Sequence, residues 1–526
     1  MIKPDIVFSA SRLPPFSEEK KTGVMSTQTI LIKRVVFLGN TVVSNTTLQD
    51  VAQPYLNRDI RFSDLQDLRL QLTQIYIAKG YINSGFLIES QDVSDGTLSF
   101  KVIEGRVKKF VVHGYKKLNR TYVEGYLRRY THLGDVLNVN QFKEGLLLFK
   151  KDPRIGMVSA HLHPMERIGE AFLDIKMEEA SPWRVRLTGS NYGSPSLGSW
   201  RSGLHVEHLN LTGSGNSLAL DYGLSAGLQD YSISYKMPVN HVRTRFVLQA
   251  SSSYSLVTSA AFRNLDIRIK SQTYAMKVEH PLWMSATSEG LFSVAYEQKQ
   301  MKTWLLGMPF SFEFGIHKGK LRTDTFLLKN EFAYYTKTRV LATHAQLAVG
   351  IAPLIRHSAD GRFINWFSQM QWLERWSVLN SYSVMKTQLR WSNDRLLSVN
   401  KYAIGGRYSV RGYRESQFSM DNAVTFKLEW YVPIFQLRVP FINSKPSDGQ
   451  VKLSVFMDYG HAWNKKNGTQ ITAHSLASVG LGLQWQINKQ YHFEVFAAKP
   501  LQKVIQSTQK DLQDIGVHLQ LWAQLL

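Results

Sequence analysis

The amino-acid sequence predicts a mostly β protein, an antiparallel transmembrane β-barrel of about 16 strands preceded by two small α/β modules. Helical periodicity is confined to the first 180 residues, where one order of strands and helices occurs twice. From residue 181 to residue 526 the pattern alternates between apolar and polar residues, with no break that would separate a further domain. A closed barrel is favoured because it leaves no strand edge exposed.

The composition limits the class of protein. The chain has 526 residues, no cysteine and a formal net charge of +22. A charge this basic favours an anionic neighbour, either nucleic acid or a charged membrane surface. The basic residues are spread along the chain without a nucleic-acid-reading motif, so we expect no nucleic-acid partner. The lack of cysteine excludes disulfides and thiolate metal sites. No apolar run reaches the roughly 18 residues of a membrane helix, and a mean hydropathy of −0.21 suits barrel strands.

The first module covers residues 29–106, after a linker at 1–28 that shows no period. Its order is predicted as β-α-α-β-β, beginning with a strand at 30–40. A capping box from Thr47 to Asp50 predicts the start of the short first helix. The second helix is predicted at 63–81, with Ser63 as N-cap and Gly80 as its end. Its apolar face consists of Leu65, Leu68, Leu72 and Ile75.

The second module, residues 107–180, repeats this order. A strand at 108–115 is followed by helices at 120–130 and 140–151 and by two closing strands. A tandem pair of small modules suggests an arm for docking a partner. The alternative is a single ordinary α+β domain.

In the alternating region, single strands fit a soluble sandwich as well as a barrel. In "VGLGLQWQIN" (479–488), for example, Leu481 and Leu483 lie on one face, and Gln484 and Gln486 lie on the other. The absence of a domain break is what favours the barrel over the sandwich. The polar faces would then line its lumen.

A segment of roughly 30 residues, 392–422, separates two of these strands, and loops longer than about 15 residues are usually functional or disordered. It contains "GGRYSVRGYRE" (405–415), which is rich in glycine and arginine. In the strand at 452–463, period two places Asp458 on the lumen face. A loop folded inward would bring Arg411 to this carboxylate, and we predict that the two form an ion pair. The alternative is that both charges are solvated.

No pattern indicates an enzyme. The sequence "GLSAG" (223–227) matches the nucleophile elbow G-x-S-x-G, but an alternating strand follows it where the elbow needs a helix. Ser225 is therefore expected at a turn. The 15 histidines show no metal-binding spacing, and no nucleotide-binding motif is present. We expect no catalytic residues, no metal and no cofactor.

Together, "SVRGYRE" and "FMDYG" resemble the paired signatures of the outer-membrane superfamily that includes BamA. The resemblance implies that the loop folds into the barrel, where its arginine meets the aspartate of the strand. The loop-latch motif consists of Val410, Arg411, Gly412 and Tyr413, and the lumen strand motif consists of Phe456, Asp458 and Gly460.

Three further stretches resemble the two-partner-secretion transporters (TpsB), the ShlB/FhaC/HecB hemolysin secretion/activation family. These are 91–107, 138–164 and 191–239, similar to the end of a first POTRA domain, to a second POTRA domain and to the opening barrel strands. The resemblance implies periplasmic POTRA domains at 29–106 and 107–180 and a 16-stranded outer-membrane barrel at 181–526. The implied function is capture of a large exoprotein, adhesin- or hemolysin-like, and its export in the unfolded state. Outer-membrane lipids, lipopolysaccharide and the barrel assembly machinery are further implied partners.

Two departures from the family pattern concern the ends of the chain. "RLPPF" (12–16) resembles the end of the family's linker, and no signal peptide or plug helix is recognised before it. At the other end stands Leu526, with Trp522 as a nearby aromatic residue, where barrel proteins usually present a terminal aromatic. A BamA-like insertase is the alternative function, although such chains carry more POTRA copies. A passive porin would not need a docking arm.

Overall fold

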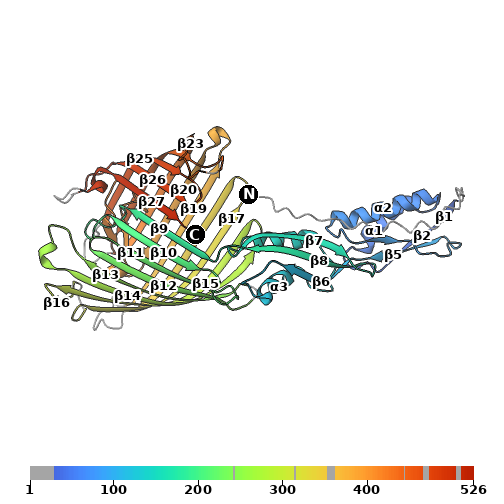
Figure 1. Ribbon diagram of the computed structural model, residues 1–526, viewed down its shortest axis with the longest axis horizontal. Helices are drawn as coiled ribbons and strands as arrows, with labels where there is room; N and C mark the ends of the chain where they lie inside the picture. The colour runs from blue at the N-terminus through green and yellow to red at the C-terminus, as the bar shows by residue number, and fades with distance from the viewer. Residues whose placement is uncertain are drawn as a thin grey trace. The chain divides into compact units, whose positions relative to one another are not determined.

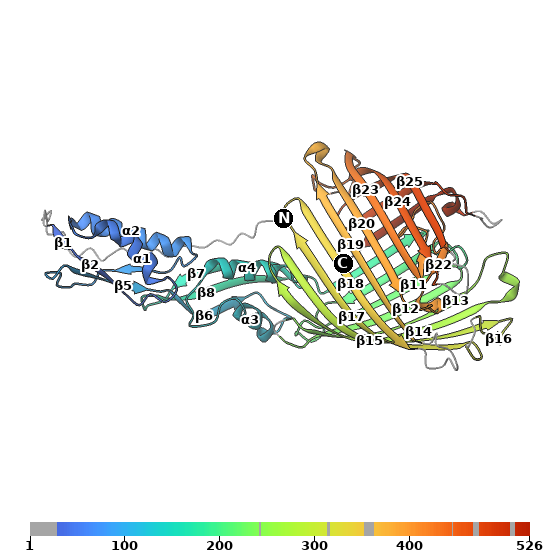
Figure 2. The same ribbon diagram turned by 180° about the vertical axis from the view of Figure 1, so that it is seen from behind.

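The computed structural model describes residues 29–240, 243–312, 316–351, 362–443, 445–465, 473–504 and 511–525. The chain divides into two compact units, Met1–Ala180 and Ser181–Leu526. The first unit contains the α-helices and the second is a β-barrel (Figures 1 and 2). The predicted linker at 1–28 lies outside the described residues. Within the ranges given, no helix has the length and hydropathy needed to span a membrane.

The first module has the predicted order, with small additions. Its elements are β1 (Ile30–Ile32), β2 (Arg34–Leu38), α1 (Asn45–Ala52), η1 (Gln53–Tyr55), β3 (Arg58–Ile60), α2 (Phe62–Ala78), β4 (Gly85–Leu87) and β5 (Thr97–Ile103). The main sheet has the strand order β2-β5-β4, and β1 pairs separately with β3. The strand predicted at 30–40 is therefore two short strands in two different sheets.

Both predicted helix starts in this module were wrong. The side chain of Ser44 caps α1 by accepting from the Thr47 N–H at 3.3 Å, so the helix begins before the predicted capping box. In α2 the N-cap is Arg61, whose N–H donates to Asp64 at 2.8 Å, and Ser63 lies inside the first turn. Both helices therefore begin earlier than predicted: the N-cap side chain of Ser44 binds the first turn of α1, and the Asp64 carboxylate of α2 reaches back to the N-cap backbone.

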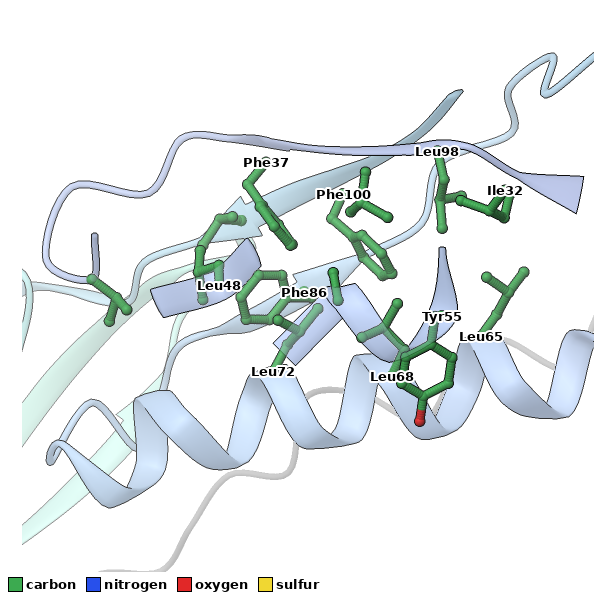
Figure 3. Close-up of a cluster of buried hydrophobic side chains, with 14 of the residues drawn as sticks. Ile32, Phe37, Leu48, Tyr55, Leu65, Leu68, Leu72, Phe86, Leu98 and Phe100 are labelled. Atoms are coloured by element: carbon green, nitrogen blue, oxygen red, sulfur yellow. The ribbon is translucent and has the colours of Figure 1, made fainter. Parts of the chain in front are cut away.

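The apolar face of α2 forms the core of the first module. Leu65, Leu68 and Leu72 point from the helix toward the aromatic rings of the sheet (Figure 3). Phe86 and Phe100 are among these rings, and both are at most 1% exposed. Burial of each such side chain stabilises the module by about 1.5–3 kcal/mol.

The second module repeats the arrangement in the same unit. It consists of β6 (Arg106–His113), α3 (Arg120–Arg128), α4 (Val139–Lys150), β7 (Ile155–Pro164) and β8 (Glu170–Glu179), with the strand order β6-β8-β7. The two modules are joined by hydrogen bonds at the start of α4. The Val139 N–H donates to the Gly80 carbonyl at 2.9 Å, and the Asn138 amide donates to the Lys79 carbonyl at 3.1 Å.

The second unit is a closed antiparallel barrel of 16 strands, which confirms the predicted fold class. The strands are β9 (Trp183–Ser190), β10 (Arg201–His208), β11 (Ser217–Leu224), β12 (Leu228–Pro238), β13 (Arg245–Leu256), β14 (Arg268–Met284), β15 (Ser288–Leu305), β17 (Lys320–Tyr335), β18 (Arg339–Ile351), β19 (Arg362–Arg375), β20 (Tyr382–Ser392), β23 (Asn422–Gln436), β24 (Gln450–Trp463), β25 (Ala473–Gln486), β26 (Tyr491–Pro500) and β27 (Val517–Gln524). The two-residue β16 (Met308–Pro309) pairs antiparallel with the end of β15 and is not counted among the 16. Pairing of β27 with β9 closes the barrel.

The alternation of β24 has the predicted phase. Its outward residues, such as Val455 and Met457, are 46–47% exposed, whereas inward-facing Phe456 and Asp458 are at most 5% exposed. Ser225 follows β11 in the turn before β12, and its hydroxyl donates to the Leu197 carbonyl. The absence of a helix after β11 confirms that this serine is a turn residue and not part of a nucleophile elbow.

Candidate functional site: the inward loop and the barrel wall

The long segment between β20 and β23, residues 393–421, is here called the inward loop. It contains a helical turn, η5 (Ser398–Asn400), and a short hairpin of β21 (Tyr402–Ile404) and β22 (Phe418–Met420). Apolar side chains of the loop pack against the barrel wall in a cluster of Ile404, Val410, Tyr413 and Met420 with Ala423, Ala462 and Leu476. The loop is thus folded against the inner face of the barrel.

Two glycines of the predicted motifs are needed at this contact. Gly412 has φ +87°, a left-handed conformation that favours glycine. Gly460 on β24 faces the loop, and a Cβ at this position would lie 2.8 Å from Val410 Cγ2. The contact between the loop and β24 therefore requires the absence of a side chain at residue 460.

Arg411 and Asp458 are brought together, and neither side chain is exposed. Arg411 Nε donates to Asp458 Oδ2 and Nη2 donates to Oδ1, both at 2.7 Å. The Arg411 N–H also donates to Oδ2 at 3.0 Å. This bidentate geometry fits the planar guanidinium fork, and a lysine would not reproduce it.

A second carboxylate and two aromatic rings complete the surroundings of Arg411. Glu429 of β23 lies 2.6 Å from Arg411 Nη1. The guanidinium carbon lies 3.5 Å from the ring centroid of Phe456 and 4.8 Å from that of Phe496. These cation–π contacts attract the guanidinium and offset part of the cost of removing it from water.

The neighbours of Arg411 in the loop-latch motif also contact the wall. The Gly412 N–H donates to His518 Nε2 of β27 at 3.2 Å. The Tyr413 hydroxyl donates to the Ala477 carbonyl at 2.8 Å and accepts from the Gln502 N–H at 3.1 Å. Successive residues of the loop are therefore bound to different strands of the barrel.

The other two arginines of "GGRYSVRGYRE" form ion pairs of their own. Arg407 contacts Glu494 of β26 through Nε at 3.3 Å, and its guanidinium lies 4.2 Å from the Phe496 ring centroid. Arg414 binds Asp514 through Nε at 2.5 Å. No partner for Arg407 or Arg414 was predicted from the sequence.

Several wall residues of the site were missed. Glu429 had a sequence signal, since period two in "AVTFKLEWYV" (423–432) places it on the lumen face with Lys427. Period two also separates Glu494 from Phe493 and Val495 on its strand, but Asp514 had no such signal. The approach of both carboxylates to the loop depends on the packing of segments far apart in the sequence. Lys427 donates to the Arg407 carbonyl at 2.5 Å and lies 3.9 Å from Asp458.

The chemistry of this site is ionic and aromatic, with no metal-ligand set. In the described ranges, no group of three or more His, Cys, Asp or Glu side chains is arranged to hold a metal ion. A cavity of about 120 Å³ beside the loop is lined by charged residues that include Lys386, Arg407, Lys427 and Glu429. The arrangement holds a loop inside a barrel, with charged side chains around the cavity beside it.

Two families of proteins match the chain, one over its first module and one over most of the barrel. The POTRA domain of ShlB type matches residues 30–105, and the haemolysin secretion/activation protein ShlB/FhaC/HecB matches residues 169–485. The second match covers more than half of the chain. The chain belongs to the ShlB/FhaC/HecB family of haemolysin secretion/activation proteins, as the sequence resemblance implied.

Curated relatives match over most of their length. The heme/hemopexin transporter protein HuxB of Haemophilus influenzae is 21% identical over 96% of this chain and 89% of its own. The outer membrane transporter CdiB of Escherichia coli O6:K15:H31 is 23% identical over 78% of this chain and 70% of its own. The hemolysin transporter protein HpmB of Proteus mirabilis is 22% identical over 77% and 74%. These relatives are transporters, and the chain is an outer-membrane protein of two-partner secretion with periplasmic POTRA domains.

Solved structures share the fold. CdiB from Escherichia coli superposes with a TM-score of 0.69 at 18% identity, covering 97% of this chain and 93% of its own. BamA from Haemophilus ducreyi lacking POTRA domains 1–3 has a TM-score of 0.57 at 15% identity, covering 95% and 100%. The similarity is higher to the transporter than to BamA.

Proposed function

We propose that the protein captures a large secreted exoprotein in the periplasm through its POTRA domains and exports it, unfolded, through the barrel. Transporters of this family work with secreted exoproteins. The match of the barrel to the family is the observation that carries the proposal. A BamA-like insertase is less well supported, because the family match is to secretion/activation proteins and the likeness to BamA is one of fold alone.

The domain bounds follow from the two units and the two modules. We assign residues 29–106 and 107–180 to the POTRA domains and 181–526 to the barrel. Because the POTRA domains precede β9, the first residues of β9 lie on the periplasmic side and successive strands alternate in direction. The inward loop then enters the lumen from the extracellular side.

The sheets of the two POTRA domains supply strand edges for cargo capture. β2 and β4 are the edges of the first sheet, and β6 and β7 are the edges of the second. An extended chain adds to such an edge through main-chain hydrogen bonds, which bind an unfolded segment with little dependence on its sequence. The outward apolar faces of the strands suit membrane lipid, and the net charge of +22 suits anionic lipopolysaccharide. The barrel assembly machinery is the expected partner during insertion.

The inward loop closes the route that the cargo takes. Displacement of the loop requires that Arg411 leaves Asp458 and Glu429, which are its buried partners. Export therefore depends on an ion pair that is stable at rest and is broken during passage. No nucleotide is available outside the inner membrane, and folding of the cargo on the far side would bias its direction.

The function is tested by expressing the transporter with its cognate exoprotein and measuring the exoprotein in the culture supernatant. Deletion of residues 29–106 should abolish binding of the cargo's N-terminal domain and should leave the barrel in the outer membrane. Retained binding by the truncated protein would contradict the role of the first POTRA domain. Rescue of general outer-membrane protein assembly in a BamA-depleted cell would favour the insertase instead.

A further inference from the structure

The turn between β26 and β27 is the feature that the function above does not use. It contains η6 (Leu512–Ile515) at its end, directly before β27. The side chain of Gln513 in this turn is fully buried, which is unusual for a polar residue in a connection between barrel strands. A buried amide must satisfy its hydrogen bonds inside the protein.

The Gln513 amide joins three segments of the chain. Its Nε2 donates to the Asn191 carbonyl at 2.6 Å and to the Gly193 carbonyl at 2.8 Å, both in the connection after β9. Its Oε1 accepts from the Glu415 N–H of the inward loop at 2.8 Å. One side chain of the turn thus binds the end of the first strand and the inward loop at the same time.

The neighbours of Gln513 bind the same two segments. Asp514 forms the ion pair with Arg414 of the inward loop. Asp511 accepts from the Ser199 hydroxyl, which lies before β10, at 2.6 Å. The turn is therefore attached on one side to the loop and on the other to the connection between β9 and β10.

The place where Gln513 binds Asn191 is the closure of the barrel. The β27–β9 ladder has five paired positions, from Gln520↔Ser190 to Gln524↔Arg186, whereas β9 and β10 pair over eight. Beyond Ser190 the side chain of Asn191 continues the contact, because its Oδ1 accepts from the Leu519 N–H at 2.8 Å. Its Nδ2 donates to the Val517 carbonyl at 2.9 Å. Buried side-chain amides hold the extracellular part of the closure.

We propose that Gln513 is a positioning residue that couples the inward loop to the β27–β9 closure of the barrel. Because the amide can make all three hydrogen bonds only when both segments are in place, release of the loop weakens the closure, and opening of the closure weakens the loop. Such coupling is reciprocal by thermodynamic linkage. The proposal rests on the proposed displacement of the loop, but its test does not measure export.

The absence of cysteine from the chain allows a clean reporter. In Val410→Cys, a thiol at a fully buried position of the loop is labelled by a maleimide only when the loop leaves the wall. Hydrogen exchange of residues 517–524 reports on the closure in the same purified full-length protein. Gln513→Ala should accelerate the maleimide labelling at residue 410 and the hydrogen exchange at 517–524 by about tenfold each, within the usual range of coupling between sites.

The matched control is Asn216→Ala, which removes another buried amide. Asn216 is buried in the connection between β10 and β11, where its side chain accepts from the Thr212 N–H at 3.0 Å and donates to the Tyr235 hydroxyl of β12 at 2.8 Å. It should leave labelling at residue 410 unchanged. Equal acceleration by Asn216→Ala would overturn the proposal, since general loosening of the barrel would then explain the result.

Reciprocity is tested from the other side with Asp458→Asn, which releases Arg411. This change should raise exchange at 517–524 as well as labelling at 410, and unchanged exchange at 517–524 would overturn the coupling. If Gln513→Ala fails to insert, Gln513→Glu retains the acceptor for Glu415 and loses both donors to the β9 end. Gln513→Glu should accelerate hydrogen exchange at 517–524 more than maleimide labelling at 410. A larger effect on labelling than on exchange would contradict the roles assigned to the Gln513 hydrogen bonds.

Discussion

In the first POTRA domain the buried side chains around Phe100 are apolar, whereas those between the inward loop and the barrel wall are charged. Apolar burial is non-directional and tolerates small shifts of its members. The Arg411–Asp458 contact depends on bond geometry and leaves a costly buried charge when either partner is removed. The first region suits a domain that stays folded, and the second suits a contact with two discrete states.

The largest expected effect is on the charged region. Arg411→Ala or Asp458→Ala should destabilise the seated loop by about 3–5 kcal/mol, because the remaining charge stays buried without its partner. Because export is proposed to depend on an ion pair that forms at rest as well as breaks during passage, exoprotein in the culture supernatant should fall sharply, while the amount of barrel in the membrane changes little. Arg339→Ala is a control, because Arg339 pairs with Glu374 but is 58% exposed, and such a pair contributes at most about 1 kcal/mol. Normal secretion by both Arg411→Ala and Asp458→Ala would exclude a role for the ion pair.

The next effect concerns the apolar region. Leu68→Ala should destabilise the first POTRA domain by about 2–5 kcal/mol, since Leu68 is fully buried and the change leaves a cavity. Leu70→Ala is the control, because Leu70 lies on the same helix but is 52% exposed. This change should alter stability by about 0.5 kcal/mol or less. Hydrogen exchange of α2 in the full-length protein measures both variants. A similar effect at the two positions would mean that the core is not packed as described.

A smaller effect is expected in a double-mutant cycle on Arg411 and Asp458, which separates the interaction between the two charges from the cost of burying each one. The double variant Arg411→Met with Asp458→Asn removes both charges, so the loop should be destabilised by about 1–3 kcal/mol less than the sum of the two single changes. Maleimide labelling of Val410→Cys in each background gives the four values of the cycle. Additive effects would show that the two side chains act independently.

The smallest expected effect is on the stability of the first POTRA domain, where Glu104 is a charged residue within the apolar region. Glu104 of the first POTRA domain accepts from the N–H groups of Thr41 at 2.6 Å and Val42 at 3.0 Å and from the Tyr76 hydroxyl at 3.1 Å. Burial opposes ionisation, but these hydrogen bonds and one from the Thr41 hydroxyl outweigh it and hold the pKa of Glu104 below its usual value. This contribution to stability is present above the ordinary glutamate pKa of about 4.3 and is lost as the pH falls through the lower pKa of the folded state.

Glu104→Gln tests this assignment. It should cost about 1–2 kcal/mol at neutral pH and should reduce the dependence of exchange in the 41–42 segment on acid pH. An unchanged acid dependence in the variant would mean that another group is responsible.

The sequence was informative where a contact depends on strand periodicity. Asp458 could be placed in the lumen because residues two apart on a strand share a face, and the glycine-rich loop could be recognised by its length. The same reasoning could have included Glu429, which shares the lumen face of its strand with Lys427. Periodicity gives the face of a strand and not the identity of the segment that approaches it.

The remaining partners depend on tertiary register. Glu494 and Asp514 reach Arg407 and Arg414 across separations of 87 and 100 residues. Nothing local to those carboxylates distinguishes them from other acidic residues of the barrel. The helix starts failed for a local reason, because Ser44 and Asp64 cap helices that begin earlier than the capping pattern predicted.

Gly460 is not one of the glycines with a positive φ, so its backbone does not need glycine. Its role at the Val410 contact is therefore one of volume alone. Steric fit and charge are consequently independent variables at this interface. A single methyl group at residue 460 would collide with Val410 and shift the loop, although it replaces no charged side chain. The seating of the loop therefore depends on the volume at one uncharged position as well as on the ion pairs that bind it.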